Sequence, residues 1–267
     1  MLEGKKGLIL GVANKRSLAW AIARSCAQRG AQVGLTYQGP RFESGVRELA
    51  ATLPCGADTP LFTCEITQQA DIDALAAAVK AKWGTLDFIV HSIAFANPEE
   101  LKRPFRETSR EGFQVALDVS TFSLLPLAKA LVPLMPNGGS IVALSYLGGE
   151  RVVPNYNLMG VAKAALDSAV RYLAYDVGPL GIRVNCVSPG PVRTISASAI
   201  SDFGKMLEHV ERVAPLRRNI TAEEVGDVCA FMVSDLSRAI TGQQIHVDCG
   251  YSIMGVTTVA ELAEGKA

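Results

Sequence analysis

The sequence has few of the residues that build metal sites and disulfide frameworks. It contains three histidines and six cysteines among 267 residues. The cysteines lie far apart, without a Cys-x-x-Cys pair and without histidines at metal-ligand spacing. We therefore expect buried thiols, no metal and a reducing compartment such as the cytoplasm. The cysteines are Cys26, Cys55, Cys64, Cys186, Cys229 and Cys249.

The chain also lacks an excess of charge of either sign. Its 26 basic residues balance 26 acidic residues, so we expect no general attraction to nucleic acid or anionic lipid. No apolar run approaches the ~18 residues of a membrane span, and the first residues lead directly into an apolar strand rather than a cleavage site. These absences predict a protein that binds neither nucleic acid nor membrane, and whose partner is a small or locally steered molecule.

Short apolar or β-branched runs alternate with longer stretches of helical periodicity along the whole chain. Runs that are apolar on both faces, each followed by a crossover of helix length, predict a parallel sheet covered on both sides. No linker divides the chain, so the sequence predicts a single α/β domain over residues 1–267, doubly wound and Rossmann-like, with about seven strands. The expected strands are 7–12, 32–37, 60–64, 86–92, 140–145, 182–188 and 244–247. The main expected helices are 18–29, 71–83, 112–135 and 157–177.

The turn after the first strand is a candidate for nucleotide binding, because ligands of such sheets bind beyond the carboxyl ends of the strands. It begins with Gly11 but lacks the second and third glycines of the Gly-x-Gly-x-x-Gly fingerprint. Gly11 still permits a tight turn, and Ser17 and Leu18 stand at a helix start whose free N–H groups favour a pyrophosphate. A capped helix without a ligand is the alternative interpretation.

Polar residues also follow the second and third strands. Gln38 stands where an acidic residue would hold the adenosine ribose of NAD and a basic cluster would favour NADP. Gln38 can donate and accept hydrogen bonds. Arg41 alone would bind the 2′-phosphate of NADPH weakly, so the sequence favours NADH over NADPH. Glu65 offers a carboxylate to the adenine amino group. His91, at the end of the fourth strand, is interpreted as a packed histidine rather than a base.

Tyr156 and Lys163 lie seven residues apart, which is nearly two turns of a helix. We expect both side chains on one helix face, with Gly160 between them leaving room for a flat ring or sugar. A nearby cation lowers the pKa of a phenol from about 10 and makes it a better proton donor. The lysine could also orient a nicotinamide ribose. An ordinary amphipathic helix with an exposed lysine is the alternative.

Together these features resemble the short-chain dehydrogenase/reductase superfamily, and the departures resemble its bacterial enoyl-acyl carrier protein reductases of type II fatty acid synthesis. Ordinary members place a tyrosine four residues before the lysine, where this chain has Met159. They also place a serine thirteen residues before that tyrosine, where this chain has Tyr146. Both differences are typical of the reductase branch. Further segments that match are 17–18, 36–38, 91–93, 145–148, 154–157, 190–194 and 246–248.

The resemblance implies that NADH reduces the 2,3 double bond of trans-2-enoyl thioesters on acyl carrier protein, in the last step of the elongation cycle. It implies that Tyr156 contacts the thioester carbonyl, that Lys163 holds the cofactor ribose, and that Tyr146 shares the carbonyl contact or proton delivery. A homotetramer is implied as well. The implied cofactor-binding residues are Gly11, Ser17, Leu18, Gln38, Glu65, Ile66, Ser92, Ile93, Lys163, Val192, Arg193, Thr194, Ile195 and Ser196.

The resemblance further implies a helical lid over residues 195–213 that closes on the acyl pocket; an ordinary surface helix pair is the alternative. The implied substrate pocket consists of Ala96, Tyr146, Tyr156, Phe203 and Met206. Basic residues that would attract an acidic carrier protein are Arg193, Lys205, Arg217 and Arg218.

Four residues depart from the pattern of the family: Glu65 replaces aspartate, Ala94 glycine, Pro189 alanine and Cys249 glycine. Two other functions remain as alternatives. A carbonyl reductase of the superfamily would need a tyrosine at the position of Met159. A non-enzymatic NAD(H) sensor would have no reason to bring two phenols and a cation together.

Overall fold

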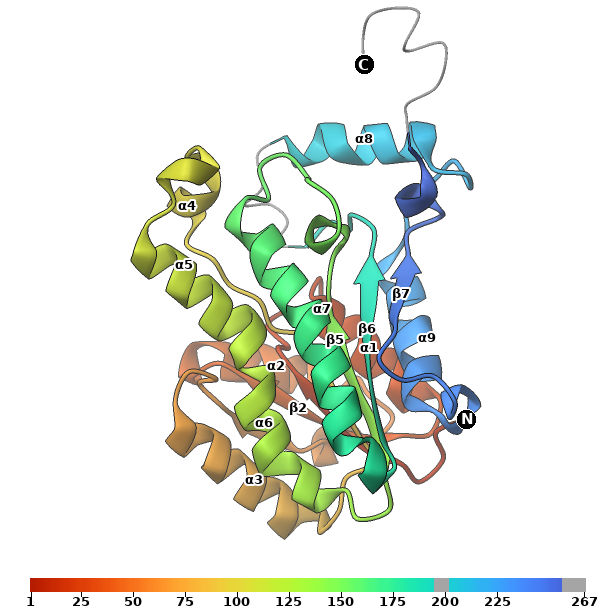
Figure 1. Cartoon of the computed structure of the whole chain (residues 1–267). Helices are drawn as coiled ribbons and strands as arrows, with labels where there is room; N and C mark the ends of the chain where they lie inside the picture. Colours follow the sequence, from red (N-terminus) through yellow and green to blue (C-terminus); the bar gives the residue numbers. More distant parts are fainter. Residues whose placement is uncertain (195–201, 256–267) are drawn as a thin grey trace, which may run out of the picture.

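The computed structural model describes residues 1–194 and 202–255 of the chain. Within these residues seven parallel strands form one sheet in the order β3-β2-β1-β4-β5-β6-β7 (Figure 1). The strands are β1 (Lys6–Leu10), β2 (Gln32–Tyr37), β3 (Leu61–Thr63), β4 (Phe88–His91), β5 (Gly139–Leu144), β6 (Ile182–Pro189) and β7 (Gln244–Val247). Two predicted strands, 32–37 and 244–247, have the observed bounds, and the other five differ only at their ends. The predicted doubly wound Rossmann-like sheet is confirmed.

The five inner strands are buried on both faces because helices cover each side of the sheet, whereas the edge strands β3 and β7 are only partly buried. In β1, Ile9 points into one core cluster, while Leu8 and Leu10 point into the other, as the alternation of a strand requires. Helices α1, α2 and α9 contribute to the cluster of Ile9, and α3, α6 and α7 to that of Leu8. The helices are α1 (Leu18–Gln28), α2 (Glu43–Ala50), α3 (Gln69–Trp83), α4 (Pro98–Lys102), α5 (Arg110–Leu117), α6 (Leu124–Leu131), α7 (Leu158–Val177), α8 (Phe203–Val213) and α9 (Ala222–Val233).

The predicted helix 112–135 is a chain of shorter pieces. A π-helical turn, Asp118–Phe122, separates α5 from α6, and the Ser123 N–H donates to the Asp118 carbonyl. Pro126 lies in the first turn of α6 and has no N–H to continue the regular ladder. Such π-turns often mark functional sites.

The same region corrects one expectation about apolar length. Among the described residues, the helical segment Arg110–Leu134 is long and apolar enough to cross a membrane by length and composition, with an 18-residue window whose mean hydropathy is 1.6. Its buried side chains, including Leu124, Leu127 and Leu131, belong to the core on one face of the sheet. The segment therefore forms part of the layer that covers the strands.

Candidate active site

The exit of β1 passes very close to the exit of β4. Gly11 has a φ of 95°, and a Cβ there would stand 2.2 Å from the carbonyl oxygen of Ser92. The Gly11 N–H donates to Thr36 Oγ1 at 3.3 Å, which ties the turn to β2. Only glycine combines this dihedral angle with this approach. The structure thus gives Gly11 a steric reason that the sequence only suggested.

Helix α1 begins next to that turn without a side-chain cap. Ser17 is the N-cap residue, but its hydroxyl donates to the Asn14 carbonyl at 2.7 Å, and among the described residues no side chain caps the first turn. The first N–H groups of a helix need a partner and carry a partial positive charge. Leu18 packs against the core behind them. This helix start is suited to an anionic group such as a pyrophosphate.

Gln38 and Glu65, which follow β2 and β3, contact each other directly. Gln38 Nε2 donates to Glu65 Oε2 at 2.6 Å, and Thr67 donates to the other carboxylate oxygen. Partial burial works to raise the pKa of Glu65, but these hydrogen bonds outweigh it and the pKa falls below its ordinary value. The side chain of Ile66 lies in the core. The two polar residues therefore act as one exposed pair.

The remaining strand exits carry half-buried residues. Ser92 and Ile93 follow β4, and Val192 and Thr194 follow β6 in the same way, while Arg193 is exposed. Ile195 and Ser196 lie outside the described residues.

His91 is buried against the helices on one face of the sheet. Its Nε2 lies 2.8 Å from Ser123 Oγ, and burial, together with the nearby charge of Lys163, lowers the pKa of the imidazole to about 3. The side chain is therefore neutral at physiological pH. This geometry agrees with the interpretation of His91 as a packed histidine.

The two predicted catalytic tyrosines pack against each other. The rings of Tyr146 and Tyr156 lie edge to face, with centroids 4.7 Å apart. Tyr156 and Ala96 both pack against a small cluster around Met159. The Tyr146 hydroxyl also lies 3.5 Å from the sulfur of Met206 on α8. The structure thus brings four of the five predicted substrate residues into one neighbourhood.

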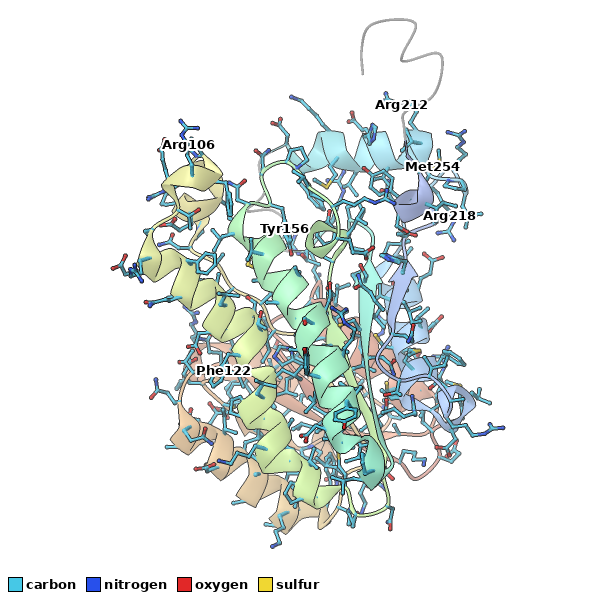
Figure 2. The ribbon with its side chains drawn as sticks, in the orientation of Figure 1. Arg106, Phe122, Tyr156, Arg212, Arg218 and Met254 are labelled. Atoms are coloured by element: carbon cyan, nitrogen blue, oxygen red, sulfur yellow. The ribbon has the colours of Figure 1, made fainter. Side chains whose placement is uncertain are left out.

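Helix α8 is the described part of the predicted lid. It lies across the carboxyl end of the sheet, above the turn that carries Tyr156 (Figures 1 and 2). Phe203, the fifth predicted substrate residue, begins this helix and is half-buried. His209 on α8 packs edge to face against Tyr251, with centroids 6.0 Å apart. Two side chains of α8 therefore reach the residues around Tyr146.

The prediction that Tyr156 and Lys163 share a helix face is wrong. Helix α7 begins only at Leu158, so Tyr156 lies in the turn before it. The residues on either side of it, Asn155 and Asn157, have φ angles of 65° and 42°. This left-handed backbone is costly for any residue except glycine and must be held by its surroundings. A strained turn, not helical periodicity, directs the phenol.

The expected space above Gly160 is also filled. A Cβ at Gly160 would stand 2.7 Å from the carbonyl oxygen of Gly148. Gly148 belongs to a short 3-10 turn, Leu147–Gly149 (η6), that packs directly on α7. The glycine is therefore required for a close backbone contact and not to leave room for a ligand.

Lys163 is only 4% exposed, and its ammonium donates to the Leu144 carbonyl at 2.6 Å. Burial lowers the pKa of Lys163 to about 8. Burial raises the pKa of Tyr146 to about 12, and it raises the pKa of Tyr156 far above its usual value, with further contributions from Tyr146 and Asp167. The prediction that Lys163 lowers the pKa of Tyr156 is therefore wrong, because burial and the neighbouring Tyr146 and Asp167 all raise it and Lys163 is not among the groups that act on this phenol. Both phenols remain protonated at neutral pH.

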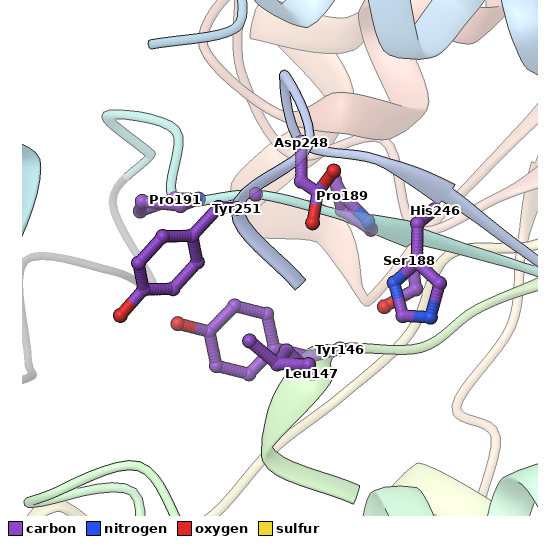
Figure 3. A pocket seen from close by; sticks show the side chains of 9 residues that line it. Tyr146, Leu147, Ser188, Pro189, Pro191, His246, Asp248 and Tyr251 are labelled. Atoms are coloured by element: carbon purple, nitrogen blue, oxygen red, sulfur yellow. The ribbon is translucent and has the colours of Figure 1, made fainter. Parts of the chain in front are cut away.

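Sequence reasoning missed two residues of this region. Asp167 lies one helical turn after Lys163, a spacing that could have indicated it. Tyr251 lines a pocket beside Tyr146, and the two hydroxyls point toward the same space (Figure 3). The pocket is lined by Tyr146, Leu147, Ser188, Pro189, Gly190, Pro191, His246, Asp248 and Tyr251.

Comparisons with known proteins show the family of the chain. The family model described as Enoyl-(Acyl carrier protein) reductase matches residues 11–252. The chain belongs to the enoyl-acyl carrier protein reductase family. A relative is the NADH-dependent enoyl-acyl carrier protein reductase FabI of Bacillus subtilis, 52% identical over 94% of this chain and 97% of the relative.

Solved structures of this reductase family have the same fold. The enoyl-acyl carrier protein reductase of Bacillus cereus, with NADP+ and indole naphthyridinone, has a TM-score of 0.94 and is 50% identical, covering 96% of this chain and 99% of that one. The enzyme of Anaplasma phagocytophilum, in complex with NAD, has a TM-score of 0.91 and is 44% identical, covering 97% and 95%.

Proposed function

We propose that this chain reduces the 2,3 double bond of trans-2-enoyl thioesters on acyl carrier protein, with NADH as the hydride donor. Membership of the reductase family supports this reaction. The observation that carries the proposal is the edge-to-face pair Tyr146 and Tyr156, which lies beside the strand end to which the ammonium of Lys163 is hydrogen-bonded. Two protonated phenols and a buried cation at the carboxyl edge of the sheet suit a reaction in which negative charge develops on a carbonyl oxygen.

The residues at the β1 and β2 exits fit a dinucleotide. The close approach at Gly11 and the uncapped start of α1 at Ser17 leave N–H groups for a pyrophosphate. The ionised Glu65 bonded to Gln38 disfavours the extra phosphate of NADPH and favours NADH. When bound, the reduced cofactor supplies the hydride. The residues proposed to hold it are Gly11, Ser17, Leu18, Gln38, Glu65, Ile66, Ser92, Ile93, Lys163, Val192, Arg193 and Thr194, with Ile195 and Ser196 beyond the described residues.

The catalytic residues divide the remaining work. Tyr156 donates its hydroxyl hydrogen bond to the thioester carbonyl oxygen, and its raised pKa keeps that proton in place until charge develops. Lys163 supplies positive charge and holds ribose hydroxyls. Tyr146 lines the site and shares the carbonyl contact or proton delivery. Hydride from NADH would add to the β-carbon, leaving NAD+, and a proton would add to the α-carbon of the resulting enolate to give the saturated thioester.

Helix α8 is proposed to be part of a lid that residues 195–213 form over the acyl pocket. Its Met206 contacts the hydroxyl of Tyr146, and Phe203 stands at its first position. These side chains, with Ala96 and the two tyrosines, form the apolar pocket for the acyl chain. Closing it excludes water from the developing enolate.

The acidic carrier protein is proposed to approach over Arg193, Lys205, Arg217 and Arg218. Two of these are engaged in ion pairs: Lys205 with Asp202 at 2.9 Å, and Arg218 with Glu224 at 2.6 Å. Exposed pairs of this kind are worth about 0–1 kcal/mol. A carrier carboxylate can therefore exchange with them at little cost.

We also propose that the chain works as one domain in a cytoplasmic homotetramer. A continuous sheet supports the single domain. Large apolar side chains lie exposed from α5 to α6, including Phe113, Phe122 and Leu125, and only 39% of that segment's apolar window is buried. Such a patch is typical of an interface, and a second copy of the chain is the proposed occupant.

Turnover of a crotonyl thioester tests the proposed reaction. We expect NADH absorbance to fall faster than NADPH absorbance under matched conditions. Consumption of cofactor with ketones but not with the enoyl thioester would indicate a carbonyl reductase. Binding of NADH without turnover of either would indicate a sensor.

A further inference from the structure

Two buried charged side chains on successive turns of α7 hold consecutive residues at the end of β5. Lys163 Nζ donates to the carbonyl of Leu144, and Asp167 Oδ1 accepts from Ser145 Oγ at 2.5 Å. Asp167 is 7% exposed. Tyr146 follows Ser145 directly. The carboxylate is therefore connected through one side chain to the backbone that carries a proposed catalytic phenol.

The carboxylate of Asp167 is enclosed on its other sides. A Cβ at Gly149 would stand 2.8 Å from Asp167 Oδ2, so η6 passes directly over it. The thiol of Cys186 on β6 also hydrogen-bonds the carboxylate. Strands β5 and β6 and the turn η6 therefore meet at this one group. A buried carboxylate is costly unless it has charged and hydrogen-bonding partners.

We propose that Asp167 is a positioning residue for the reduction: it keeps Lys163 protonated in its buried site and holds Ser145, and through it Tyr146, in place. This inference rests on the proposed function and adds a residue to it. It assigns Asp167 two separable tasks, one by charge and one by hydrogen bonding.

The charges around Lys163 support the first task. Burial lowers the pKa of Lys163 to about 8, whereas anionic Cys186 or Asp167 would raise it. The pKa of the Cys186 thiol lies well above its usual range because of burial, so the thiol is neutral at physiological pH. His91, on β4, is neutral as well. Asp167 is therefore the counter-charge that acts on Lys163.

Other titratable groups around the pair act more weakly or on its partners. Burial raises the pKa of Asp167, hydrogen bonds from Ser145 and Cys186 oppose this, and the charge of Glu150 adds to it. Arg171, one turn farther along α7, acts on Cys186. The phenol of Tyr156 remains protonated.

Two substitutions separate the two tasks, and two more serve as rescue and backup variants. Asp167→Asn keeps an oxygen that can accept from Ser145 but removes the charge. Ser145→Ala removes the hydroxyl and keeps the charge. Asp167→Glu restores the charge and serves as the rescue variant, and Asp167→Ser is a second uncharged variant in case the asparagine fails to fold.

The pH profile of kcat/KM for NADH is the first measurement, because it reports groups of the free enzyme. Without the carboxylate the ammonium form of Lys163 is less favoured, so its pKa falls. As the pH rises, Lys163 then loses its proton earlier, and the decline of activity on the basic side begins at a lower pH. We expect Asp167→Asn to move the basic limb down by about one pH unit. Ser145→Ala should leave the limb in place and lower kcat about tenfold, and Asp167→Glu should return the limb toward the wild type.

A titration of the cofactor-free protein gives a readout independent of turnover. Lysine labelled with ¹³C at Cε is followed by NMR, and the signal of Lys163 is assigned by its loss in Lys163→Arg. We expect the midpoint to shift downward in Asp167→Asn or Asp167→Ser. An uncharged variant that folds and keeps the wild-type midpoint and pH profile would overturn the proposal. A wild-type protein without enoyl thioester turnover would instead refute the proposed function, while the NMR midpoint would still test the charge.

Discussion

In the proposed nucleotide site, Gly11 and Ser17 present backbone groups, and Gln38 and Glu65 form an exposed pair. In the proposed catalytic site, the ammonium of Lys163 is buried and hydrogen-bonded to a strand carbonyl. The first region uses shape and a helix terminus, which tolerate changes of nearby side chains. The second uses buried charges and phenols whose pKa values depend on every neighbour. Substitutions of similar size should therefore have larger effects in the second region than in the first.

The largest effect is expected for Lys163→Ala. The change removes positive charge and the proposed ribose contact, and it leaves the Leu144 carbonyl and the buried Asp167 without their cation. We expect kcat/KM to fall more than about a thousandfold, since a single preorganised donor already contributes about a hundred- to a thousandfold. Steady-state kinetics and NADH binding check this result. Lys80→Ala, on the exposed side of α3, is the matched control. Normal turnover and normal NADH affinity in the Lys163 variant would contradict the proposed roles of Lys163 in supplying charge and holding the ribose.

Tyr156→Phe should have the next largest effect. It removes one donor to the carbonyl oxygen, but Tyr146 lies close enough to compensate in part. We expect a loss of about a hundredfold in kcat with a small change in KM for NADH. Tyr175→Phe, which changes an exposed tyrosine on α7, should behave like the wild type. A larger loss than that of Lys163→Ala would reverse the assignment of the two roles.

Gly11→Ala should affect the nucleotide end through the backbone. The added methyl would meet the Ser92 carbonyl, and the φ of 95° is unfavourable for alanine. We expect a loss of about 1–3 kcal/mol in the free energy of unfolding and weaker NADH binding. Thermal unfolding with and without NADH measures both. Gly45→Ala, on α2, has open space around it and serves as control. Unchanged stability in Gly11→Ala would show that the two strand exits can move apart.

Gln38→Ala should have the smallest effect. It removes one hydrogen bond from an exposed pair, worth about 0.5–1.5 kcal/mol, so KM for NADH should rise by about tenfold or less. Kinetics with NADH and NADPH in parallel check it, because Glu65 remains and should still disfavour NADPH. A variant that prefers NADPH would show that Gln38, not Glu65, sets the selectivity.

The sheet could be predicted from the sequence because it depends on two local signals, the length of each strand segment and the residues that follow it. Strand β2 is a mostly buried run of the expected length, and β7 has the expected bounds although its residues are half-buried. The rule for parallel sheets places Gly11, Gln38 and Glu65 at one edge. The same reasoning could not give the contact between Gln38 and Glu65, which depends on how two exits approach each other. It selected plausible residues before it could assign their geometry.

The catalytic end was harder to predict because long-range contacts decide it. The spacing of Tyr156 and Lys163 suggested a helix, but the left-handed backbone at Asn155 and Asn157 ends that periodicity before Leu158. Burial also reversed the expected shift in the pKa of the phenol. Asp167 escaped notice because its partners, such as Ser145, lie on other elements. Periodicity describes one element at a time, and this region is built where several meet.

The turn before α7 gives a distant loop influence over the proposed chemistry. The side-chain amide of Asn157 donates to the carbonyls of Leu101 and Arg103, both at 3.0 Å. These two hydrogen bonds from the end of α4 hold the unfavourable backbone beside Tyr156 in place. A sequence change in that loop, with no atom near a substrate, would weaken these hydrogen bonds and let the ring of Tyr156 change its orientation. Variation around α4 is thus a route by which related enzymes could adjust their activity while every reacting group stays the same.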